Sequence, residues 1–135
     1  MPLSINKLKG STPELEAKLK ERGLKTADDL FNAAVTPAAR EELAAHAGVE
    51  TQVILQLANR ADLARIQGIA GIYGDLLEEA GVDTVKELKG RVPENLHAKL
   101  LEINTAKNLT PKPPALKTVK NWVTLARRRR KFLQY

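Results

Sequence analysis

Apolar residues recur every three or four positions along most of the chain. The clearest example is "GVETQVILQLANRADLARI", in which Val53, Ile54, Leu57, Ala61 and Ile66 suit one face of a helix. No stretch of the sequence shows the strict alternation of apolar and polar residues that marks a half-buried strand. The pattern therefore predicts an all-α protein.

Short motifs mark where these helices begin and end. Thr12-Pro13 and Thr36-Pro37 each offer an N-cap threonine followed by a proline at the first helical position. The stretch "TVKE" at 84–87 has the pattern of a capping box, and "TADD" at 26–29 is a weaker version. Helices are expected to stop at three glycines that each precede an apolar residue: Gly23, Gly48 and Gly81.

The two halves of the chain repeat one another. At one constant offset, Gly10, Leu19, Glu21, Gly23, Thr26 and Leu30 align with Gly68, Leu77, Glu79, Gly81, Thr84 and Leu88. We expect one helical unit used twice. The first unit with a linking helix would occupy residues 1–60, the second with a C-terminal helix residues 61–126, and a basic tail residues 127–135. A chain of 135 residues suits one compact domain that contains both units.

Three glycines at every third position precede the first helix of the second unit: Gly68, Gly71 and Gly74. Their spacing is wrong for a dinucleotide-binding loop, and the preceding "NRADLARI" has helical rather than strand character. Glycine lets a backbone approach another group closely, and that group can be a phosphate or a neighbouring helix. The sequence leaves both interpretations open.

A last helix is expected after the proline-rich connector "LTPKPPALK", which should be extended. Its apolar positions Leu116, Val119, Trp122, Val123 and Ala126 form one stripe. We expect this stripe to close the core, with Trp122 as its largest side chain. A docking helix for a partner is the alternative.

The positive charge is concentrated at the C-terminal end. The net charge is +6, yet residues 103–135 contain nine Lys and Arg residues and no acid, whereas the remainder has 13 basic and 16 acidic residues. Five consecutive cations, Arg127–Lys131, precede Phe132 and Tyr135. Such a segment is attracted to nucleic acid, anionic lipid or an acidic protein, and interleaved aromatic residues suit phosphate contact with stacking.

Other classes of function find no support in the sequence. The absence of cysteine excludes disulfides and thiolate metal sites. No signal peptide or membrane span is apparent, so we expect a cytoplasmic protein. His46 and His97 lie in different units and are expected on helix surfaces. Without a catalytic motif, the chain is expected to be a non-enzyme with no cofactor and no small-molecule substrate.

The stretch "IQGIAGIYGDLLEEAGVDTVKELKGRVPENLHAKLLEIN" resembles the helix-hairpin-helix unit. It is more closely similar to a bacterial family of uncharacterised proteins in which such units are paired, and the likeness runs from about Ile5 to Ala126. The resemblance implies DNA binding without base specificity, through hairpin backbone amides. It makes Gly68, Ile69, Ala70 and Gly71 the hairpin, with Ile69 as its buried anchor. The matching stretch of the first unit, from Gly10 to Pro13, would be structural only.

The predicted function is therefore binding of DNA, duplex or single-stranded, through the second hairpin and the basic tail. A non-enzymatic protein adaptor or scaffold is the alternative. The residues expected to contact DNA are Arg65, Gly68, Ile69, Ala70, Gly71, Lys117, Lys120, Arg127, Arg128, Arg129, Arg130 and Lys131.

Overall fold

A computed structural model describes residues 3–69 and 71–135 of the chain. Within these residues the fold is all-α, as predicted, and contains no β-strand beyond an isolated bridge between Ser4 and Thr26. The elements are η1 (Ile5–Lys7, a 3-10 turn), α1 (Pro13–Lys20), α2 (Ala27–Ala33), α3 (Pro37–Ala47), α4 (Thr51–Leu63), α5 (Ile72–Glu79), α6 (Val85–Lys89), α7 (Pro93–Lys107) and α8 (Leu116–Arg127).

Threonine side chains begin four of the helices. Thr12, Thr26, Thr36 and Thr84 each accept a hydrogen bond from the backbone N–H three residues later. The capping box is complete at Thr26, because the Asp29 carboxylate also accepts from the Thr26 N–H. At Thr84 only the forward half of the box forms. The complete capping box is therefore at Thr26 and the partial one at Thr84, which is the reverse of the prediction.

A glycine follows each of the helices α1, α3 and α5, either directly or after a short turn, and ends the helical backbone there, as predicted. Gly23, Gly48 and Gly81 have φ values of +77°, +70° and +85°, a backbone conformation that glycine adopts at little cost. In each case the next residue donates its N–H back to the preceding helix, from Leu24 to Leu19, from Val49 to Ala44 and from Val82 to Leu77.

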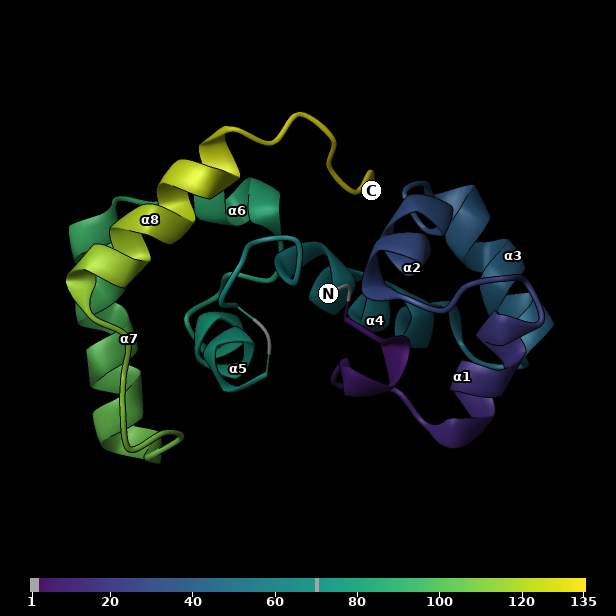
Figure 1. Cartoon of the computed structure of the whole chain (residues 1–135), viewed down its shortest axis with the longest axis horizontal. Helices are drawn as coiled ribbons and strands as arrows, with labels where there is room; N and C mark the ends of the chain where they lie inside the picture. Colours follow the sequence, from purple (N-terminus) through teal and green to yellow (C-terminus); the bar gives the residue numbers. More distant parts are fainter. Residues whose placement is uncertain (1–2, 70) are drawn as a thin grey trace.

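The buried apolar side chains form two clusters. One contains residues of η1 and α1–α4 together with Leu133, and the other contains residues from Leu63 to Ala126. Helices α1, α2 and α3 gather at one end of the molecule, while α6, α7 and α8 lie at the other (Figure 1). Helix α4 contributes Ile54 to the first cluster and Leu63 to the second, so it joins the two ends.

Four of the five residues of the predicted stripe on α8 close the second cluster, whereas Leu116 in the first turn is only partly buried. Val119, Trp122, Val123 and Ala126 are all buried, and the Tyr73 ring centroid lies 5.6 Å from that of Trp122. Residues 108–115, which form the connector before α8, contain no helix.

The last eight residues, 128–135, are here called the C-terminal segment, and they return across the molecule towards α2 (Figure 1). Phe132 packs against the second cluster, whereas the next residue, Leu133, is buried in the first. The Gln134 N–H donates to the Val35 carbonyl at 2.7 Å, and Arg40 donates to the Gln134 carbonyl. These residues are part of the fold and not only a solvated tail.

Candidate functional site

The second hairpin has the backbone geometry expected of a glycine-dependent turn. Gly68 and Gly71 have φ values of +94° and +68°, and Ile69 between them is buried, as expected of an anchor. Ala70 lies outside the described residues. Gly71 is the N-cap of α5, and no described side chain caps this helix.

The three glycines meet different surroundings. A Cβ built at Gly74 would lie 2.6 Å from Nη1 of Arg60, and one built at Gly68 would lie 3.4 Å from Nε1 of Trp122. At Gly71, no described atom outside the adjoining residues lies within 4 Å of the corresponding position. Gly74 therefore admits an arginine from α4, whereas a Cβ at Gly71 would meet no described atom beyond the adjoining residues.

The acidic residues of α5 are paired with cations. Arg60, which is only 7% exposed, contacts Asp75 and Glu78, and Lys9 donates to Glu78 at 2.9 Å. Partial burial alone would raise the pKa of Glu78, but the Lys9 hydrogen bond and the Arg60 charge hold it below its usual value. These pairs offset the negative charge beside the hairpin. Lys9 was not predicted, because it is 69 residues from Glu78 in the sequence.

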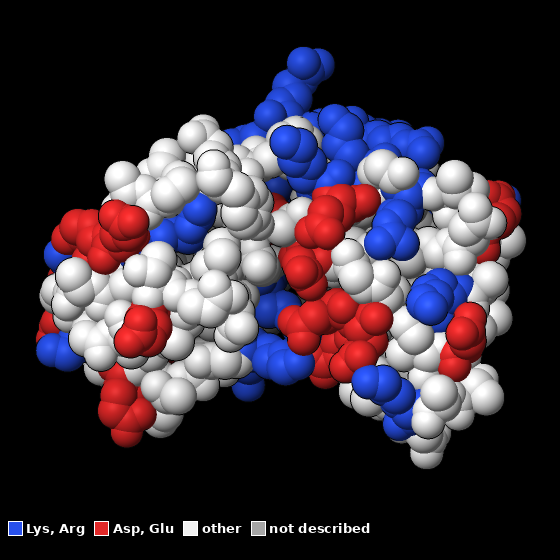
Figure 2. All heavy atoms as spheres, turned by 180° about the vertical axis from the view of Figure 1, so that it is seen from behind, with Lys and Arg blue, Asp and Glu red and all other residues white. Residues whose placement is uncertain are grey.

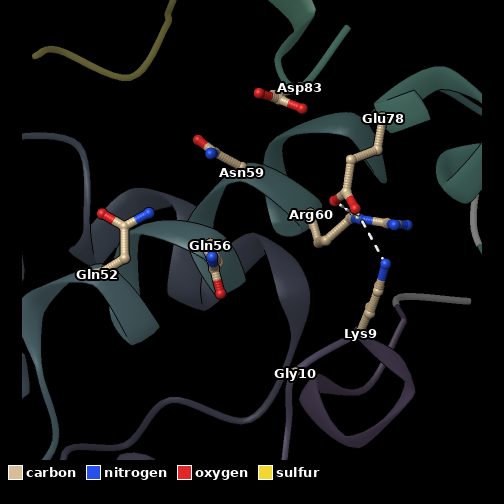
Figure 3. A pocket seen from close by; sticks show the side chains of 8 residues that line it. All are labelled: Lys9, Gly10, Gln52, Gln56, Asn59, Arg60, Glu78 and Asp83. Carbon is tan, nitrogen blue, oxygen red and sulfur yellow. Dashed lines mark hydrogen bonds and ion pairs between the residues drawn. The ribbon is translucent and has the colours of Figure 1, made fainter. Parts of the chain in front are cut away.

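A cleft of 370 Å³ lies beside these ion pairs (Figure 3). Helix α4 supplies Gln52, Gln56, Asn59 and Arg60 to its lining, and Lys9, Gly10, Glu78 and Asp83 complete it. Burial, followed by the charges of Glu87 and Glu78, raises the pKa of Asp83. The cleft is thus lined by amides and by charges of both signs.

The predicted tail cations gather on one side of the molecule. Arg127, Arg128, Arg129, Arg130 and Lys131 are all exposed, and no ion pair joins them to an acid in the described ranges. Figure 2 shows Lys and Arg side chains collected along the top edge, where Figure 1 places the end of α8 and the C-terminal segment.

Two lysines of α6 join this group, although the sequence placed them near the second hairpin and not among the residues expected to contact DNA. Arg127 donates to the Lys89 carbonyl at 3.3 Å, and Lys89 Nζ lies 5.0 Å from the centroid of the Phe132 ring. Lys86 lines a groove together with residues of the C-terminal segment. The exposed cations of α6 and the chain end are here called the basic surface: Lys86, Lys89 and Arg127–Lys131. The packing of α6 against α8 brings the lysines close to the tail cations.

The groove beside α6 has a volume of 550 Å³ and is here called the C-terminal groove. It is lined by Lys86, Arg130, Phe132, Leu133, Gln134 and Tyr135. It therefore combines two cations with two aromatic side chains.

Arg65 has an internal role in the structure. Its side chain is 9% exposed, pairs with the buried Asp62 and lies over the Phe31 ring at 3.9 Å from the centroid. It also donates to the Lys131 carbonyl at 2.9 Å, while Arg129 donates to the Arg65 carbonyl. Arg65 thus positions the C-terminal segment rather than facing solvent.

Lys117 and Lys120 lie on α8 and are exposed. Lys120 Nζ is 3.5 Å from a carboxylate oxygen of Glu94 on α7, so its charge is partly neutralised. The structure therefore brings Arg65, Arg129 and Lys131 into direct contact, but it gives Lys120 a separate partner.

The histidines contact backbone carbonyls. Nε2 of His46 lies 3.0 Å from the Lys18 carbonyl oxygen and Nε2 of His97 lies 3.1 Å from that of Pro114. In the described part of the chain, His, Asp and Glu side chains form no group that could hold a metal ion. Among the same residues, no helix combines the length and the apolar character needed to cross a bilayer.

Comparison with known protein families identifies a match over most of the chain. Residues 9–129 match the family described as "Domain of unknown function (DUF4332)". No curated protein and no solved structure matches the chain.

Proposed function

The chain belongs to the DUF4332 family of domains of unknown function, and we propose that it binds nucleic acid without base specificity through the basic surface. The observation that carries this proposal is the run of exposed cations from Arg127 to Lys131, to which no described acid is paired. Like charges this close repel one another, and a polyanion relieves that repulsion. Contacts from such side chains to phosphate release counterions and carry no sequence information.

The anchoring of the C-terminal segment supports the proposal. Leu133 is buried, and the backbone on either side of it is held by Arg65, Arg40 and Val35. The backbone that bears the cations is therefore already ordered before binding. Less conformational entropy is lost on binding than a disordered basic tail would lose.

The second hairpin offers a further contact for the same ligand. The first turn of α5 begins at Gly71 without a described side-chain cap, and backbone N–H groups at a helix start attract anions. Lys7, Lys9 and Gly71 line the same small depression, so the two lysines lie close to this helix start. The ion pairs of Asp75 and Glu78 reduce the repulsion that these acids would exert on a phosphate.

Charge reversal on the basic surface tests the proposal. Fluorescence anisotropy with labelled DNA at two salt concentrations compares the wild type with Arg128→Glu/Arg130→Glu. The matched control is Lys99→Glu/Lys112→Glu, which changes the net charge equally at exposed lysines of α7 and the connector. We expect the arginine variant to bind DNA at least about tenfold more weakly. Its affinity should also fall less steeply with salt concentration, by the amount expected for the loss of roughly two phosphate contacts.

Two results would overturn the proposal. One is equal affinity of the two double variants for DNA. The other is absence of binding by the wild type at low salt, which would favour the protein-adaptor alternative.

A further inference from the structure

The C-terminal groove presents an aromatic ring beside two cations. Tyr135 is 69% exposed and lines a groove whose other lining residues include Lys86 and Arg130. The groove is widely open to solvent, so a chain can enter it from outside.

The Tyr135 ring is held in place from one side. Its hydroxyl donates to Oδ1 of Asn59 at 2.8 Å, and the Arg40 guanidinium carbon lies 5.3 Å from the ring centroid. Arg40 covers one face of the ring, and the exposure of the residue leaves the opposite face open to solvent. A fixed aromatic ring with one free face is a platform on which a planar base can stack at low entropic cost.

Two residues that line the groove are anchored to the fold, because Leu133 is buried and the Gln134 N–H donates to the Val35 carbonyl. Partial burial, with the charges of Asp62, Glu87 and Asp83, raises the pKa of Tyr135 to about 12, although Arg40 opposes the shift. The hydroxyl therefore stays protonated at neutral pH and keeps its bond to Asn59. Lys86 and Arg130 are the two cations that line the groove, so a phosphate backbone would bind there.

We infer that the C-terminal groove binds a single-stranded polynucleotide, with one base stacked on Tyr135 and the adjoining phosphates on Lys86 and Arg130. This inference rests on the proposed function and specifies the class of nucleic acid that is bound. In a duplex the faces of the bases are already stacked on one another and cannot reach the ring. Only a strand with unpaired bases can use both the ring and the cations.

The inference is tested by measuring, with fluorescence anisotropy, the affinity of the wild type, Tyr135→Leu and Tyr135→Phe for labelled oligo(dT) and for a labelled duplex of equal length. Tyr135→Leu should bind oligo(dT) about fivefold or more weakly than the wild type, while its affinity for the duplex stays unchanged. Tyr135→Phe keeps the ring and serves as the matched control, so it should retain most of the affinity for oligo(dT). Thermal unfolding checks that both variants are folded.

Photocrosslinking gives a readout that needs no variant. An oligonucleotide of 5-bromouracil bases is irradiated with the wild-type protein, and the adduct is mapped by mass spectrometry. A crosslink at Tyr135 supports the inference.

Two outcomes separate this inference from the proposed function. The stacking site alone would be overturned if the wild type bound both nucleic acids in a salt-dependent way, Tyr135→Leu bound them equally well, and no crosslink formed at Tyr135. No binding of either nucleic acid to the wild type would overturn both.

Discussion

The Arg65 guanidinium donates to Oδ1 of Asp62, and the other carboxylate oxygen of Asp62 accepts from the Val85 N–H at 2.9 Å. Asp62 is fully buried, so its charge depends on these partners. The pair links the end of α4 to the start of α6, and through the Lys131 carbonyl it also holds the C-terminal segment. A single ion pair therefore joins three separate parts of the chain.

Removal of the Arg65 side chain should destabilise the protein strongly. Arg65→Ala leaves the buried Asp62 carboxylate without its cation, which costs about 3–5 kcal/mol for a buried pair. Urea unfolding monitored by circular dichroism measures the change in the free energy of unfolding. Arg22→Ala, which removes an exposed pair with Glu42, is the control and should change it little. Equal effects of the two substitutions would contradict the role given to Arg65.

The ion pairs that Lys9 and Arg60 form with the acids of α5 should make stability sensitive to acid. The folded-state pKa of Glu78 is lowered, so its stabilising contribution is present above the ordinary pKa of 4.5 and is lost as pH falls through the folded-state pKa. Unfolding free energies of the wild type and Glu78→Gln should differ at neutral pH and converge in acid. Glu102→Gln, at an exposed position on α7, controls for the loss of one charge. A constant difference across the pH series would argue against this cluster.

Leu133 should contribute to stability as a core residue. Leu133→Ala removes a side chain buried in the first cluster, and such truncations cost about 2–5 kcal/mol. Gln134→Ala keeps the backbone bond to Val35 and has an exposed side chain, so it should stay within about 0.5 kcal/mol of the wild type. Chemical denaturation compares the two. If Leu133→Ala matched Gln134→Ala, the C-terminal segment would not be docked in solution.

A methyl group at Gly74 should disturb the contact with Arg60. The new Cβ would lie 2.6 Å from Nη1 of a guanidinium that is buried and paired with Asp75, so one of the two must move. Gly74→Ala should destabilise the protein by about 1–3 kcal/mol. Gly90→Ala is the control, because its Cβ would lie 3.6 Å from the nearest atom, the Glu87 carbonyl oxygen, at a negative φ. Thermal unfolding of both variants measures the difference, and a neutral Gly74→Ala would show that Arg60 moves freely.

The helices and their ends could be predicted because their signals are local. Thr12, Thr36 and Gly48 act on residues within one turn of themselves, so neighbouring sequence contains the whole interaction. The apolar stripe on α8 could also be predicted, because helical periodicity alone places Trp122 and Val123 on one face.

The candidate site was only partly predictable, because its contacts join distant residues. The exposure of Arg127–Lys131 followed from their charge, whereas Lys86 and Lys89 became neighbours through the packing of α6 against α8. Arg65 is only three residues from its partner Asp62, but the contacts that turn it away from solvent, with Phe31 and the Lys131 carbonyl, join distant parts of the chain. Nothing in the local sequence around Leu133 distinguished a docked apolar residue from an exposed one.

Phe132 and Leu133 are consecutive residues that pack against different hydrophobic clusters. Apart from Leu133, the first cluster consists of residues made before position 62, and the second consists of residues from 63 to 126. The first cluster can therefore begin to form while residues of the second are still being made. Residues 132 and 133 are made after the other residues of both clusters, so the docking that ties the halves together is a late event in biosynthesis.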